Sequence, residues 1–464
     1  MGRGHQLPRL PTATPRGRLM SDAFLNPLDA IRSEAVRLDG LDHDYDALIE
    51  AVGDRSFVLL GEATHGTREF YRMRAQITRR LIIERGFEAV AVEADWPDAY
   101  RLNRFVRGEG LEATARQAFD DFERFPRWMW CNEEVLSFIE WLHDHNIGRP
   151  EDSRVGFYGL DMYSLYRSAE AVIGYLEGVD QQQASLARKQ YAALDHVRDP
   201  QGYGYEVAAG LRPDCRMAVQ ERLVQLVRNA PEYLTRDGRR AADEQFFAER
   251  NAHVVMSAEA YYREMFGSRA DSWNRRDQHM TQTLFSLQHH LQSQGQAGKI
   301  VVWAHNSHLG DARATQMGEA GEWNVGQLVR QRVGSAGSML VGFTTYAGTV
   351  TAAHEWDGPA ECQIVRPARA DSYEGLFHRS RLDRFYLSLG DPVARTLHSP
   401  MLERAIGVLY RPHTEFASHY FEAMLPAQFD AVFHLDETEA VEPFDDDSHA
   451  RHRETLSSHL PGNP

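Results

Sequence analysis

The stretch "FVLLGEATHGTREFYRMRAQ", residues 57–76, combines an apolar run, an ionisable pair and the start of a helical pattern. Four apolar residues precede Gly61 and Glu62, and His65 follows three positions after the glutamate. A short apolar run that ends at a glycine is typical of a strand buried on both faces, as in parallel sheets. We therefore predict a strand at 57–62 and a helix from about residue 67 to residue 84.

Further short apolar runs have the same character, at 89–94, 155–161, 300–306, 339–346, 406–410 and 431–436. Helical patterns separate most of them, and this alternation predicts an α/β fold with a mainly parallel central sheet flanked by helices. Between Tyr163 and about Leu291 there is no strand-like run. The helical spacing of this stretch predicts a helical insertion packed over the C-terminal strand ends.

Some of the apolar runs end on an ionisable residue, namely Glu62, Glu93, Asp161 and His305. In open α/β sheets, ligands bind outside the carboxyl ends of the strands. One such ending carries little weight, because every strand must end near water. Together they indicate one cleft, in which we expect Asp161 to contact the substrate.

The helix expected after the first strand carries an arginine, Arg74, within its apolar face. The apolar residues of that face are Phe70, Met73, Ile77 and Leu81, which share one side at helical spacing. A guanidinium stays charged, so its burial requires an anion. Glu62 and Glu93 are the natural partners. The alternative is that Arg74 reaches solvent along the helix edge.

The segment "WAHNSHLGD", residues 303–311, places His308 three residues after the strand-ending His305. Together with Glu62, His65, Arg74 and Glu93, these histidines suit two chemistries. In one, a carboxylate-held imidazole activates water and a cation stabilises the oxyanion. In the other, histidines and glutamates hold a divalent metal. The nearby arginine disfavours a metal, because a fixed cation repels one.

Several other classes of protein are disfavoured by the sequence. The formal charge of -16 argues against nucleic acid or an anionic membrane as partner. No GxSxG, P-loop or GxGxxG pattern stands in its required setting, so we expect no nucleophilic serine and no nucleotide cofactor. The three cysteines are widely spaced, which suits a reducing compartment. We expect a cytoplasmic protein.

The blocks "LLGEATHGTREFYRMR", "VEADWPDAYRLNRFVRG", "FPRWMWCNEEV", "GLDMYSLYRSAEAV" and "WAHNSHLGD" resemble those of the erythromycin esterase family. The resemblance runs from about Leu25 to Asp436 and implies an α/β core with a helical portion and an open cleft. It also implies metal-independent hydrolysis of a lactone ester. By resemblance, His65 is the general base for water and the other cleft residues are Glu62, Arg74, Glu93, His305 and His308.

The resemblance leaves the substrate open, and we expect a small-molecule ester, with a macrolide as one candidate. Trp128 and Trp130 are candidates for lining the substrate pocket, or alternatively for packing in the core. In "SWNRRDQHM", Asn274, Arg276 and Asp277 resemble a family block, and we interpret them as a structural ion-pair group that joins the insertion to the core.

We predict a disordered extension at 1–20, one catalytic domain at 21–441 that includes the insertion at about 163–291, and a flexible tail at 442–464. The hypothesis is a cofactor-free carboxylic ester or lactone hydrolase. The first alternative is a metal-dependent hydrolase or peptidase that uses the same histidines and acids as ligands. The second is a non-catalytic protein that binds a ligand in the cleft.

Overall fold

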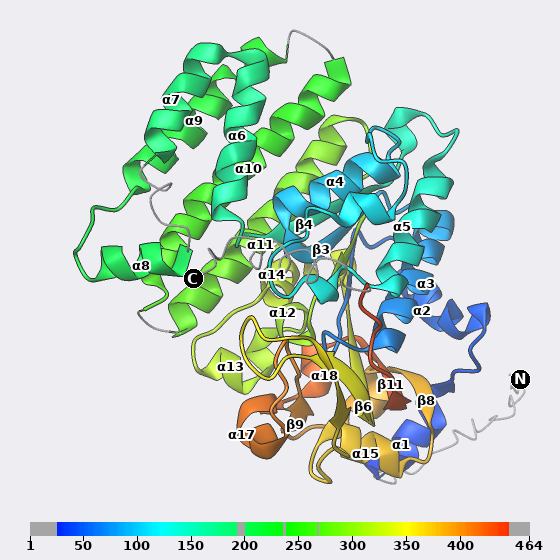
Figure 1. The fold of residues 1–464 in the computed structure, drawn as a ribbon. Coiled ribbons are helices and arrows are strands. Elements are labelled where there is room, and N and C mark those ends of the chain that lie inside the picture. Colours follow the sequence, from blue (N-terminus) through cyan, green and yellow to red (C-terminus); the bar gives the residue numbers. More distant parts are fainter. Residues whose placement is uncertain (1–25, 193–199, 235–237, 267–268, 445–464) are drawn as a thin grey trace, which may run out of the picture.

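The computed structural model describes residues 26–192, 200–234, 238–266 and 269–444. One large sheet runs through the molecule (Figure 1). The strands are β1 (Val36–Arg37), β2 (Phe57–Leu60), β3 (Ala89–Asp95), β4 (Gly156–Asp161), β5 (Ile300–Trp303), β6 (Ser338–Ala352), β7 (Glu361–Val365), β8 (Arg384–Ser388), β9 (Met401–Arg404), β10 (Tyr420–Ala423) and β11 (Ala431–Thr438). The extension predicted at 1–20 and nearly all of the predicted tail lie outside the described residues.

The strand order across the sheet is β1-β8-β11-β6-β2-β5-β3-β4, and β7 pairs with β6. From β11 to β4, neighbouring strands run parallel. The antiparallel pairs of this sheet involve β1, β8 and β7, and β9 and β10 form a separate ribbon. The prediction of a mainly parallel sheet flanked by helices is confirmed.

The helices surround this sheet (Figure 1). They are α1 (Pro27–Glu34), α2 (Asp46–Val52), α3 (Arg68–Arg85), α4 (Trp96–Val106), α5 (Glu133–Asn146), α6 (Leu165–Val179), α7 (Gln181–Tyr191), α8 (Pro200–Ala208), α9 (Arg216–Tyr233), α10 (Gly238–Glu264), α11 (Arg269–Ser293), α12 (Asn306–Leu309), α13 (Gln316–Glu319), α14 (Val325–Gly337), α15 (Tyr373–Arg379), α16 (Asp391–Ala394), α17 (Glu415–His419) and α18 (Leu425–Gln428). Within the described ranges, no helix is long and apolar enough to cross a membrane.

Both faces of the sheet are buried, because alternate strand residues enter different hydrophobic clusters. In β2, Val58 and Leu60 pack in the cluster that includes α2, α3 and α5. Phe57 and Leu59 pack on the opposite face, in the cluster that includes α11, α14 and α15. Burial on both faces explains why the strands read as unbroken apolar runs rather than as alternating ones.

The helices between β4 and β5 divide into two groups. Helices α6–α10 share a hydrophobic cluster of their own, which includes Leu165, Leu176 and Leu226, and they extend from the β4 side of the molecule, far from β8 (Figure 1). Helix α11 instead packs Met280 and Leu284 in one of the two sheet clusters. The described part of the predicted insertion therefore consists of helices joined by loops, but its last helix belongs to the sheet core.

The prediction of a strand at 406–410 is wrong. Ile406 and Leu409 form only isolated bridges, to Thr64 and Ala353. Ile406 N–H donates to the carbonyl of Ala63, and its own carbonyl accepts from His65 N–H. This apolar run therefore supports the loop after β2 instead of joining the sheet, and strand β8 (Arg384–Ser388), which was not predicted, stands beside β11.

Candidate active site

The strand ends singled out in the sequence lie side by side, because β2, β5, β3 and β4 occupy consecutive places in the sheet. Glu62 follows β2 and His305 follows β5, whereas Glu93 and Asp161 lie within the last residues of β3 and β4. The carboxyl ends of parallel strands meet at the same edge of the sheet. The chain order of these residues therefore differs from their spatial order, and all of them reach one region.

On the β2 side, Arg74, Glu62 and His65 form a linear polar group. Nη2 of Arg74 lies 2.5 Å from Oε2 of Glu62, and Oε1 of Glu62 lies 2.9 Å from Nδ1 of His65. Arg74 is fully buried, and its guanidinium stacks over the rings of Tyr71 and Trp303. The interpretation that Arg74 is buried against a carboxylate is confirmed.

This group determines the tautomer of His65. An ionised carboxylate only accepts hydrogen bonds, so Nδ1 of His65 carries the proton and Nε2 keeps its lone pair. Nδ1 is occupied by Glu62, whereas Nε2 has no hydrogen-bond partner among the described residues. The ring is 7% exposed and lines a cavity. His65 is therefore oriented as a proton acceptor toward that cavity.

His305 lies beside His65, with 4.9 Å between the ring centroids, but its nitrogens are occupied. Nε2 is 3.2 Å from the carbonyl oxygen of Ala63 and donates to it. Nδ1 accepts from the hydroxyl and the backbone N–H of Ser307, at 2.8 and 3.2 Å. Burial and the nearby His65 lower the pKa of His305 to about 3. His305 is thus a neutral, fully hydrogen-bonded residue that holds the loops after β2 and β5 together.

Glu93 connects the β5 loop to helix α11. Its Oε2 accepts from the backbone N–H of His305 at 2.9 Å, and its Oε1 accepts from Nη2 of Arg276 at 2.7 Å. Burial by itself raises the pKa of this carboxyl, but the charges of His308, Arg276 and His65 outweigh burial and hold the pKa well below its usual value. Glu93 is therefore an ionised anchor for two cleft elements.

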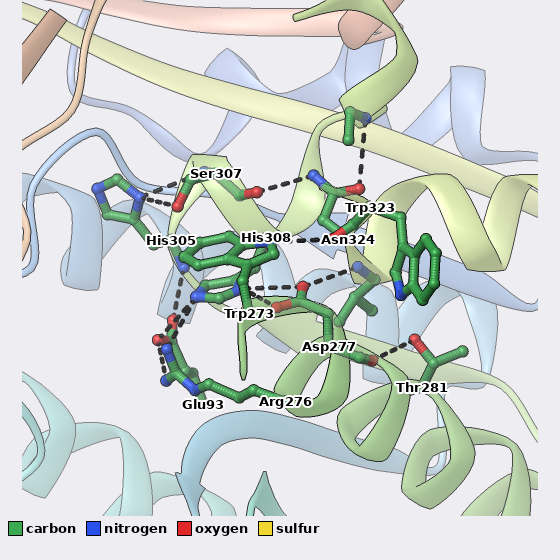
Figure 2. A network of polar contacts seen from close by, with 12 residues as sticks. Glu93, Trp273, Arg276, Asp277, Thr281, His305, Ser307, His308, Trp323 and Asn324 are labelled. Atoms are coloured by element: carbon green, nitrogen blue, oxygen red, sulfur yellow. Dashed lines mark hydrogen bonds and ion pairs between the residues drawn. The ribbon is translucent and has the colours of Figure 1, made fainter. Parts of the chain in front are cut away.

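His308 is enclosed by the network in Figure 2. Its Nδ1 lies 2.9 Å from both carboxylate oxygens of Asp277, and its Nε2 is 3.4 Å from Oε1 of Glu93. Trp273 stacks on the ring at 4.5 Å. Burial lowers the pKa of His308, but Asp277 and Glu93 outweigh burial and raise it. His308 therefore joins α12 to α11 between two carboxylates.

Arg276 is one of the arginines that line the cavity. Its Nε and Nη2 donate to the two oxygens of Asp161 at 3.1 and 2.7 Å, and Nη2 also donates to Glu93. The guanidinium stacks 5.0 Å from the ring centroid of Tyr163. The contacts of Asn274, Arg276 and Asp277 agree with the interpretation of these residues as a group that joins the insertion to the core. Asn274, for its part, donates to the carbonyl of Gly321.

The cavity beside these residues has a volume of about 190 Å³. Its ionisable lining residues are His65, Glu93, Asp95, Asp98, Arg124, Arg127, Asp161 and Arg276. Its aromatic lining residues are Phe122, Phe125, Trp130, Tyr163 and Trp356. Phe125 meets Trp356 edge to face at 5.0 Å, so the loop before α5 contacts the turn between β6 and β7 at the cavity.

The wall formed by β3 and α4 carries two aspartates, Asp95 and Asp98. Oδ2 of Asp95 accepts from Nε of Arg124 at 2.9 Å, and Oδ1 accepts from the N–H of Tyr163 at 2.8 Å. Asp98 lies within ion-pair distance of Arg167, at 3.2 Å. Burial and the neighbouring Asp95 raise the pKa of Asp98 to about 8.

The predicted site residues separate into those that line the cavity and those that stand behind it. Lining residues are His65, Glu93, Asp161 and Trp130, whereas Glu62, Arg74, His305 and His308 are absent from the described lining. Trp128 packs in the hydrophobic core and does not line this cavity, so its position fits the core alternative rather than substrate binding. The roles assigned to these residues stay predictions.

The sequence reasoning did not single out Asp95, Asp98, Arg124 or Tyr163, and it interpreted Arg276 first as part of a structural ion pair. A signal existed for two of them, because Asp95 and Asp98 lie in the block "VEADWPDAY" directly after a strand. Arg124 and Arg276 lie in segments that follow no strand. Their place at the strand ends depends on packing between distant segments.

A divalent ion in this site would need free donor atoms. The ring nitrogens of His305 and His308 already contact protein atoms, and Arg276 lies between the carboxylates of Glu93 and Asp161. Within the described parts of the chain, no group of three or more His, Cys, Asp or Glu side chains is arranged to hold a metal ion.

Known proteins are similar to this chain over most of its length. The erythromycin esterase type II of Escherichia coli is 22% identical over 321 residues, which cover 67% of this chain and 73% of that protein. A solved structure of a protein from Bacillus cereus matches 90% of this chain and 98% of its own, with a TM-score of 0.74 and 19% identity. A mutant of the erythromycin esterase EreC in its open conformation matches 87% of this chain and 97% of its own, with a TM-score of 0.63 and 16% identity.

The family model described as erythromycin esterase matches residues 82–438. This range contains Glu93, His305 and His308, whereas Glu62, His65 and Arg74 precede it. The matched range covers most of the sheet, the helices of the insertion and the wall that carries Arg276. The chain belongs to the erythromycin esterase family.

Proposed function

We propose that this protein is a metal-independent hydrolase of a carboxylic ester or lactone, in which His65 activates water. The observation that carries the proposal is the contact between Nδ1 of His65 and Glu62, which leaves Nε2 as an acceptor beside the cavity. A general base must present a lone pair to the water that it deprotonates. Membership of the erythromycin esterase family supports an esterase at the level of reaction class.

In this reaction, Nε2 of His65 takes a proton from water while the water oxygen attacks the ester carbonyl. The carbonyl oxygen gains negative charge, and a nearby fixed cation lowers the energy of that state. Arg276 supplies this cation, because it lines the same cavity as His65 and is held there by Glu93. Arg74 acts indirectly, because it holds the carboxylate of Glu62, which orients His65.

The other histidines are positioning residues in this proposal. His305 supports the loop after β2 through its contact with Ala63, next to the residues that lead to His65. His308 keeps Asp277 and Glu93 together at the start of α12. Neither ring lines the cavity, so neither one contacts the substrate as the structure stands.

The size of the cavity bears on the substrate. At about 190 Å³ it is smaller than the ~300–1,000 Å³ typical of sites that bury drug-sized ligands. The cavity therefore holds the reacting ester group and its nearest substituents, and a larger alcohol or acid portion extends beyond it. Macrolides and simple esters are both candidates under this description.

The test is a hydrolysis screen of macrolides, simple lactones, and alkyl and aryl esters, with and without EDTA. We expect turnover that survives EDTA and gains nothing from added Zn²⁺ or Mn²⁺, and that is lost in His65→Ala. Turnover that requires a metal would favour the metal-dependent alternative instead.

Ligand-induced thermal stabilisation in both wild type and His65→Ala, without turnover in either, would favour the binding-protein alternative. The matched control is His143→Ala, since His143 lies on α5 and does not line this cavity. Its activity should equal that of the wild type.

A further inference from the structure

Among the carboxyl groups that line the cavity, Asp98 has different surroundings from the others. Both oxygens of Glu93, Asp95 and Asp161 accept hydrogen bonds. Asp98 is 4% exposed, and neither of its oxygens makes a hydrogen bond to the described residues. Its single close charged contact there is Nη1 of Arg167, 3.2 Å from Oδ1.

Four charged groups surround Asp98, and they come from three segments of the chain. Asp95 precedes the helix that carries Asp98, and Arg124 lies in the loop before α5. Arg167 belongs to α6 and also pairs with Asp121. The two acids oppose a negative charge on Asp98 and the two arginines favour one. Burial is the largest cause of the raised pKa of Asp98, and together with the two acids it raises that pKa to about 8. The raised pKa favours the protonated, uncharged form of this carboxyl near neutral pH.

Ester hydrolysis needs a proton at the alcohol oxygen when the C–O bond breaks, because an alkoxide is a poor leaving group. The residues behind the cavity do not meet this need. His305 has both nitrogens hydrogen-bonded to protein atoms. His308 contacts Asp277 through Nδ1 and lies close to Glu93 and Arg276 through Nε2, and its ring does not line the cavity. Arginine does not release a proton at working pH.

We propose that Asp98 is the general acid that protonates the leaving alcohol. The proposal rests on the hydrolase function proposed above, and it adds a residue from the wall formed by β3 and α4. Asp98 fits because it lines the same cavity as His65 and has a carboxyl oxygen that the protein does not occupy.

The reaction balances as follows. Water gives one proton to Nε2 of His65, and its oxygen forms a bond to the carbonyl carbon, whose π electrons move to oxygen. When the tetrahedral intermediate collapses, the bond to the alkoxy oxygen breaks with its electron pair. That oxygen takes the proton of Asp98 and leaves as the alcohol. Asp98 then regains a proton and His65 loses one through solvent, so no other reactant is consumed.

The leaving-group dependence of Asp98→Asn tests this role. Ethyl acetate and 4-nitrophenyl acetate present a poor and a good leaving group on the same acyl portion. We expect kcat/KM for the ethyl ester to fall about 10²-fold or more, the range of general acid catalysis, while kcat/KM for the nitrophenyl ester changes little. Asp98→Glu should restore part of the loss on the ethyl ester.

The matched control is Asp120→Asn, which removes a carboxyl that contacts Arg101, is 64% exposed and lies outside the cavity lining. Its ratio of alkyl to aryl ester activity should equal that of the wild type. An equal loss on both esters in Asp98→Asn would show a positioning role and overturn the proposal. If the wild type hydrolyses aryl esters but no alkyl esters, the proposal is overturned as well.

The pH profile of the wild type provides a readout that does not depend on a variant that folds. An acid must be protonated to act, so kcat/KM for the ethyl ester should decline as pH rises through about 8. The nitrophenyl ester should show no such decline. Identical profiles for the two esters would contradict the assignment. Failure of the hydrolase proposal is distinct from all of these results, because it would appear as unchanged turnover in His65→Ala or as no wild-type turnover of any ester.

Discussion

The loops after β2 and β5 each place a histidine at the edge of the same sheet, with ring centroids 4.9 Å apart, yet the two residues differ in chemistry. His65 has one nitrogen bound to Glu62 and lines the cavity. His305 has both nitrogens occupied, by Ala63 and Ser307. The difference teaches that the strand-end position brings an imidazole to a site, whereas its hydrogen-bond partners decide whether it can accept a proton there.

The comparison is tested most strongly by the same substitution at both histidines. We expect His65→Gln to lower kcat/KM about 10²–10⁴-fold, since a general base contributes that much, with little change in stability. His305→Gln should lose less activity and more stability, about 1–3 kcal/mol, because it leaves buried polar groups without partners. Steady-state kinetics and urea unfolding measure the two effects. Equal losses of activity in both variants would contradict the distinction.

The carboxylate that orients His65 is itself paired with a buried cation, since Arg74 contacts Glu62. Arg74→Met leaves the buried carboxylate of Glu62 without its cation, and removing one member of a buried pair costs about 3–5 kcal/mol. Urea unfolding of wild type and variant measures the difference.

A control lies on the same helix. Arg72 contacts Glu134 from the surface with its side chain 62% exposed, and such pairs contribute about 0.2–1 kcal/mol. Arg72→Met should therefore change the free energy of unfolding far less than Arg74→Met. Similar costs for the two variants would show that the pair formed by Arg74 and Glu62 is not desolvated as the structure describes.

The smallest expected effect concerns pH. The pKa of His305 is about 3 in the folded protein and near 6.5 when exposed, so between these values the unfolded chain binds the proton. Stability from this group is therefore complete above pH 6.5 and declines as pH falls toward 3, by at most about 1.4 kcal/mol per pH unit.

His305→Gln removes this titration. We expect the difference in unfolding free energy between wild type and His305→Gln to shrink as pH is lowered from 7 to 5, measured by urea unfolding at each pH. The raised pKa of His308 acts in the opposite direction, but it is present in both proteins and largely cancels. Parallel curves for the two proteins would show that His305 does not stay neutral in the fold.

Much of the fold could be predicted because its signals are local. Burial on both faces makes each central strand an unbroken apolar run, and β2, β3, β4, β5, β6 and β11 all read that way. The run at 406–410 has the same apolar character, but it forms isolated bridges beside the β2 loop, and its buried residues Ile406 and Tyr410 pack in a small separate cluster. Strand β8 has a charged residue at its start and an exposed end, so its pattern was too short to recognise.

The same distinction between local and long-range signals applies to the candidate site. Glu62 and His65 are three residues apart, and Arg74 lies on the helix that follows, so the sequence by itself determined that group through short-range geometry. Arg276 meets Asp161 and Glu93 across 115 and 183 residues, and no local pattern encodes such a meeting. Only the tertiary structure decided which imidazole nitrogen stays free and which buried acid makes no hydrogen bond to the described residues, because each depends on contacts from segments that come together when the chain packs.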